Sequence, residues 1–155
     1  MVQLLILVMG IALASYVVMA GISYFNVDGV KAKEREAQWA TLNLSLAQGW
    51  IDAQRLNRQA PGSPEALLAS AHLHMGIPDG MTLTELGSGY AGWCFTGTAE
   101  KSDVDALVSL ATRYPATYGI ANDCGASNGI SEDWSQGAAE SGPQALAVTY
   151  RLNRP

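Results

Sequence analysis

The chain opens with a long apolar stretch that differs from everything after it. Residues 4–25 carry no charge, and Asp28 is the first charged residue in the sequence. A helix of about 22 residues rises about 1.5 Å per residue, so it reaches ~33 Å and can cross a hydrocarbon core of about 30 Å. The pattern predicts a transmembrane anchor in residues 1–27. Gly10 and Ala14 form a small-xxx-small pair, which predicts close packing against another membrane helix.

A cleaved signal peptide and a buried globular helix are the alternative interpretations of this stretch, although a globular helix of this length usually has a polar face. Residues 18–20, just before Gly21, could serve as a cleavage site. However, a signal peptide has a basic residue ahead of a shorter apolar core. The sequence therefore favours an uncleaved anchor.

An amphipathic helix is predicted next, over residues 28–58. Its apolar residues recur every three or four positions, which is the period of a helix with one buried face. Gly49 interrupts this stripe, and we expect it to allow a close approach or a slight kink. The stripe consists of Trp39, Leu42, Leu46, Trp50, Ala53 and Leu56, widened by Leu44 and Ile51. We expect Trp39, Leu42, Leu46 and Trp50 to pack this helix onto the soluble domain, residues 59–155.

The soluble domain alternates between helical and strand patterns. Ser63 and Pro64 predict the start of a short helix to His74, and Ser102-x-x-Asp105 resembles a capping box that opens a helix over 103–114. Period-two patterns predict a loose strand at 81–86 and strands at 90–96, 117–122 and 144–152, the last one half-buried, with a long polar loop at 125–142. The order predicts an α+β fold, with a small, mainly antiparallel sheet packed on the long helix.

Charge and motifs argue against several classes of function. After Gln59 there are four basic and ten acidic residues, so the domain carries a net charge of −6 and lacks the basic face that nucleic acids require. His72 and His74 point to different faces of a helix, so they do not form a metal site. No nucleophile motif or phosphate-binding loop is present. We therefore predict no catalytic, cofactor or metal site, and no enzymatic activity.

Two cysteines, Cys94 and Cys124, lie at the ends of two predicted strands. A disulfide between them would close a loop of about 30 residues and contribute about 3–4 kcal/mol. The alternative is two free, buried thiols. A disulfide needs an oxidising compartment, whereas Lys31, Lys33 and Arg35 after the anchor would hold the domain in the cytoplasm by the positive-inside rule. We favour the disulfide and an outward-facing, periplasmic domain.

The arrangement of an apolar helix, an amphipathic continuation and a small sheet resembles type IV pilins and pseudopilins. One departure concerns Leu5, which stands where pilins carry a glutamate that pairs with the neighbouring subunit's amino terminus. A closer resemblance is to the PilM family of conjugative thin-pilus systems. It rests on the N-terminal span, on Trp93-Cys94-Phe95-Thr96, on Val104-Asp105-Ala106-Leu107, and on Tyr118-Gly119-Ile120-Ala121-Asn122.

The resemblance implies a role in assembly of a type IVb pilus. The protein would be a single-pass component of the bacterial inner membrane that contacts other pilus proteins through its anchor and its acidic domain. The alternative is a minor pilin that is incorporated in the fibre, which Leu5 disfavours. A third possibility is an anchored enzyme or binding protein with a ligand pocket.

Overall fold

The computed structural model describes residues 27–57, 59–73, 76–86, 91–125, 129–135 and 143–152. The predicted anchor, with Leu5, Gly10 and Ala14, lies outside these ranges. Among the residues that are described, no helix is both long and apolar enough to cross a membrane. Residues 32–155 form one compact unit.

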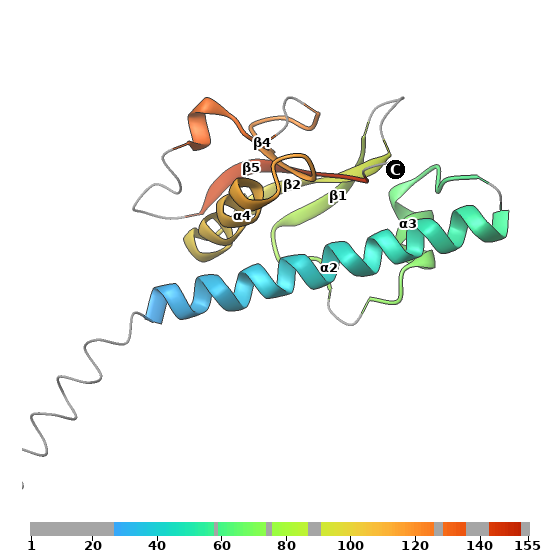
Figure 1. Ribbon diagram of the computed structural model, residues 1–155, viewed down its shortest axis with the longest axis horizontal. Helices are drawn as coiled ribbons and strands as arrows, with labels where there is room; N and C mark the ends of the chain where they lie inside the picture. The colour runs from blue at the N-terminus through green and yellow to red at the C-terminus, as the bar shows by residue number, and fades with distance from the viewer. Residues whose placement is uncertain are drawn as a thin grey trace, which may run out of the picture. The chain divides into compact units, whose positions relative to one another are not determined.

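Helices and strands follow one another in an α+β order, as predicted (Figure 1). The two long helices are α2, Val27–Asn57, and α4, Lys101–Arg113; the short ones are α3, Pro64–Ser70, and the 3-10 turn η1, Glu132–Trp134. The strands are β1, Met81–Glu85; β2, Gly92–Ala99; β3, Tyr118–Ala121; β4, Gly129–Ile130; and β5, Gln144–Arg151.

The five strands form one sheet in the order β1-β2-β5-β3-β4. Among the strands that the structure describes, three pairings are antiparallel and the short β3–β4 pairing is parallel. The sheet is therefore mixed, with antiparallel pairing predominant. The register aligns Trp93 with Tyr150 and Phe95 with Val148, so these four side chains share one face of the sheet.

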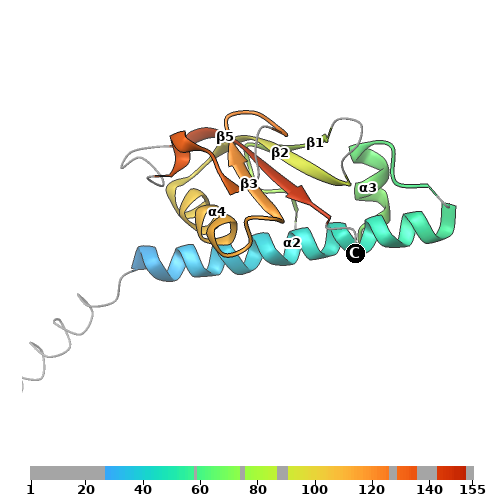
Figure 2. The ribbon, with the colours of Figure 1, turned by 45° about the horizontal axis from the view of Figure 1, so that its top comes forward.

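Helices α2 and α4 cover that face (Figure 2). Trp39 of α2 packs edge-on against Phe95, with ring centroids 5.3 Å apart. Val104 and Leu107 of α4 are fully buried in the same core. The predicted packing of the long helix on a small sheet is thus present.

Only part of the predicted stripe on α2 is buried. Leu44 is 66% exposed, Ile51 39% and Leu56 83%, so the expectation that they extend the buried face is wrong. A helix turns about 100° per residue, and Leu44 lies two residues from both Leu42 and Leu46, so it points to the opposite side. Ile51 likewise lies beyond the edge of the buried face, and Leu56 lies three residues beyond Ala53, which is buried, close to the end of the helix.

Gly49 does permit a close approach. A Cβ atom built on Gly49 would lie only 2.7 Å from the Cα of Ala71, which directly follows α3. The backbone of Ala71 is extended, and α3 therefore ends at Ser70 rather than at the predicted His74. Its start is as predicted, because the side chain of Ser63 accepts a hydrogen bond from the backbone N–H of Ala66.

Three other predicted boundaries are corrected by the structure. Strand β2 continues to Ala99 because it pairs with β5 along its whole length, and α4 begins directly afterwards at Lys101. Its N-cap is Glu100, which makes no side-chain capping bond, so Ser102 does not open the helix.

The predicted loop at 125–142 contains β4 and η1, where Trp134 is buried. Strand β5 is buried on both faces in its centre, because Ala147 and Thr149 are covered as well as Val148.

Candidate functional site

The contact between α2, α4 and the sheet contains buried polar bonds as well as apolar packing. The indole Nε1 of Trp39 donates to Oδ1 of Asp103 over 3.0 Å. Asn43 donates from Nδ2 to the carbonyl of Trp39 over 2.9 Å and accepts, on Oδ1, the indole Nε1–H of Trp93 over 2.9 Å. The indole N–H groups of Trp39 and Trp93 therefore both have an acceptor. The bonds also fix the rotation of α2 about its own axis.

Aromatic rings extend this contact along the sheet. Trp93 stacks on Tyr150 with centroids 4.7 Å apart, and Tyr118 meets Tyr150 edge-on at 5.1 Å. Trp50 lies 6.4 Å from Trp93 and is half-buried. Burial raises the pKa of Tyr118, with a further increase from neighbouring Tyr150 and a smaller decrease from a hydrogen bond with Asn43. Burial also raises the pKa of Tyr150.

The opposite face of the sheet holds the predicted disulfide between Cys94 and Cys124. Cys94 alternates with Trp93 and Phe95 along β2, so its side chain points away from α2. The hydroxyl of Thr84 lies 3.3 Å from the sulfur of Cys124, and that of Thr149 lies 3.7 Å from the sulfur of Cys94. The bond ties the centre of β2 to the segment that follows β3.

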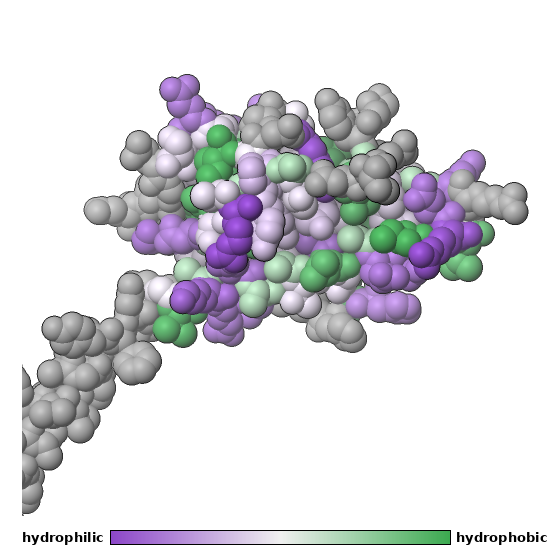
Figure 3. All heavy atoms as spheres, viewed as in Figure 1, coloured by the Kyte–Doolittle hydropathy of each residue, from purple (hydrophilic) through white to green (hydrophobic). Residues whose placement is uncertain are grey.

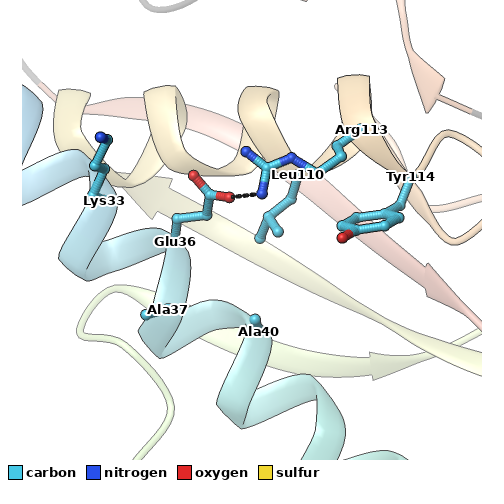
Figure 4. Close-up of a pocket in the computed structure, with 7 residues that line it drawn as sticks. All are labelled: Lys33, Glu36, Ala37, Ala40, Leu110, Arg113 and Tyr114. Atoms are coloured by element: carbon cyan, nitrogen blue, oxygen red, sulfur yellow. Dashed lines mark ion pairs between the residues drawn. The ribbon is translucent and has the colours of Figure 1, made fainter.

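A groove runs between α2 and α4 on the surface (Figure 4). It encloses about 410 Å³, and its walls are Lys33, Glu36, Ala37 and Ala40 on the α2 side and Leu110, Arg113 and Tyr114 on the α4 side. Figure 4 shows the side chain of Arg113 reaching across toward Glu36, with which it forms an ion pair of 2.7 Å. Ser109 also donates to Glu36, over 3.1 Å.

The groove combines apolar and charged lining. The ion pair between Glu36 and Arg113 crosses it, and the small side chains of Ala37 and Ala40 leave open space on the α2 side. Within the described ranges, no group of three His, Cys, Asp or Glu residues could hold a metal ion.

The structure distributes the predicted site residues over both faces of the sheet. Trp39, Leu42 and Leu46 are buried on the face of α2 that packs onto the core, and Trp50 packs against the same core. Asn43 and Asp103 were missed by the sequence analysis, although both are buried. Asn43 had a signal, because it lies four residues after Trp39 within the apolar stripe. Asp103 had none, since its partners, Trp39 and Arg35, lie far away in the sequence, Trp39 64 residues before it.

Comparison with protein-family models, with curated proteins and with solved structures finds no match to this chain.

Proposed function

We propose that this protein is a non-enzymatic component of type IVb pilus assembly, anchored in the bacterial inner membrane by residues 4–25. The proposal rests on the resemblance to the PilM family. The observation in the structure that best supports it is α2, a helix of 31 residues that is already helical at Val27, close behind the apolar stretch. Its residues 39–46 also pack onto the sheet, so the helix that follows the apolar stretch in sequence is part of the folded domain.

The disulfide supports the expected location of the domain. Disulfides persist in oxidising compartments such as the periplasm. The pairing of Cys94 with Cys124 therefore agrees with an outward-facing domain, where it would meet other pilus proteins.

The alternative is a minor pilin, because pilins also combine a long N-terminal helix with a small sheet. Residues 4–25 speak against it, since no charged residue in this stretch could set the register between pilin subunits.

Two measurements on piliated cells test the proposal. After cell fractionation, we expect the full-length protein in the inner membrane, with residues 59–155 digested only by protease that is added from the periplasmic side. After the pili are sheared off and purified, we expect the protein to stay with the cells, and deletion of its gene to abolish piliation. Stoichiometric recovery in the fibre would instead establish the minor pilin. Digestion from the cytoplasmic side alone would refute both functions.

A further inference from the structure

One side of α2 is exposed, uncharged and only partly polar. We call it the outer face, and define it as Ala37, Thr41, Leu44, Gln48 and Ile51, all of which are exposed. No charged residue occurs anywhere between positions 37 and 51, whereas Lys33 and Glu34 precede this segment and Asp52 and Arg55 follow it. Figure 3 shows hydrophobic side chains interspersed with hydrophilic ones on the part of the surface that α2 occupies in Figure 1. Solvent-exposed helices that serve no contact usually carry charges on this side.

The outer face repeats at the interval that helix pairing requires. Ala37, Leu44 and Ile51 are each seven residues apart, and this spacing keeps one seam of a helix in contact with a second helix. The seam contains two large aliphatic side chains, of which Leu44 is 66% exposed. Burying both against a partner would remove a substantial apolar surface from water.

The polar donors of the outer face already have partners within the helix. The hydroxyl of Thr41 donates to the carbonyl of Ala37 over 2.8 Å, so it is satisfied within the helix. The amide of Gln48 donates to the carboxylate of Asp52 over 3.1 Å. Since these donors already have partners, a contact along the seam would not leave them unsatisfied.

We propose that the outer face pairs with the outer face of a second copy of this chain, with the two α2 helices parallel. An uncharged face presents no repulsion to its own copy, whereas the net charge of −6 on residues 59–155 disfavours contact elsewhere between two copies. A self-complementary seam is also what a two-fold homodimer needs. The parallel orientation rests on the proposed function, because two anchors in one membrane fix both N-termini on the same side and raise the effective concentration of the pair.

Cysteine cross-linking of the full-length protein in its native membrane tests this pairing. Both native cysteines are in the disulfide, so an introduced cysteine is the only free thiol. In a parallel pair, position 51 meets position 51 of the second copy, so Ile51→Cys should yield a cross-linked dimer on mild oxidation. Leu56→Cys is the matched control, because Leu56 is more exposed and on the same helix but lies off the seam. We expect several-fold more dimer from Ile51→Cys than from Leu56→Cys.

A second variant separates specific contact from collision. Leu44→Glu in the Ile51→Cys background should reduce the dimer several-fold, while Leu56→Glu in the same background should leave the yield unchanged. Equal yields from positions 51 and 56, or no effect of Leu44→Glu, would overturn the proposal. A cross-link that forms only between Ala37→Cys and Ile51→Cys chains would show an antiparallel pair and overturn it as well. The readout is independent of piliation, so failure here is distinguishable from failure of the proposed function.

Discussion

Asn43 links α2 to the sheet through a buried hydrogen bond with Trp93. Its side chain is fully buried and bridges the backbone of Trp39 and the indole of Trp93. Replacement by leucine keeps the branched shape of the side chain but leaves the indole N–H of Trp93 buried without an acceptor. We expect Asn43→Leu to lower the free energy of unfolding by about 1–3 kcal/mol in urea denaturation. Gln54→Leu, an exposed change on the same helix, should stay within about 0.5 kcal/mol. Equal losses in the two variants would contradict the role assigned to Asn43.

Tyr118 couples stability to alkaline pH through its burial. Its pKa in the folded chain lies above the usual value near 10, so the folded state holds the proton more tightly than the unfolded state does. This contribution to stability is fully present below pH ~10 and is lost as pH rises beyond it. We expect the urea concentration at the unfolding midpoint to fall as pH rises above ~10, the range in which tyrosinate absorbance grows. The urea midpoint of Tyr118→Phe should depend less on pH in that range. If its pH dependence equals that of the wild type, a group other than Tyr118 causes the loss of stability.

The junction between α2 and α3 is a contact between whole elements, and Gly49 permits it. Alanine is favoured over glycine within a helix by about 1 kcal/mol, so propensity alone predicts that Gly49→Ala is stabilising. The new methyl group would, however, meet the backbone of Ala71 at 2.7 Å, and overpacking of this kind costs about 1–3 kcal/mol. We expect a net loss of stability in thermal unfolding. Gly62→Ala is the control, because open space surrounds Gly62 and the same change should be near neutral. If Gly49→Ala instead unfolds at a higher temperature, α2 and the end of α3 can move apart at little cost.

At the level of elements, the sequence predicted what depends on local pattern. The period of Trp39, Leu42 and Leu46 identified the buried face of α2, and strand alternation placed Cys94 opposite Trp93. The prediction failed where long-range packing decides. Leu44 was counted as buried because it is apolar, although its angular position on the helix put it outside. Asp105 was taken for a capping partner, but the pairing of β2 with β5 through Ala99 fixed the start of α4 instead.

The two faces of the sheet are stabilised by different means across the whole described domain. Two helices cover one face through a continuous apolar core, whereas a disulfide ties the segment after β3 to the other. The groove and the outer face of α2 lie on the helical side, so changes to the disulfide can be made without altering either surface.

Loss of the disulfide should therefore weaken the fold while leaving the α2 surfaces intact. The bond closes a loop of 30 residues, for which chain entropy predicts about 3–4 kcal/mol. We expect the Cys94→Ala/Cys124→Ala double variant to lose about that much free energy of unfolding, and reductant to lower the urea midpoint of the wild type but not of the variant. The variant should still protect Trp39 and Trp93 from quenching by iodide below its midpoint, because their packing does not involve the bond. If reductant leaves the wild type unchanged, the disulfide does not form in the protein; if the tryptophans become accessible, the two faces of the sheet are not independent.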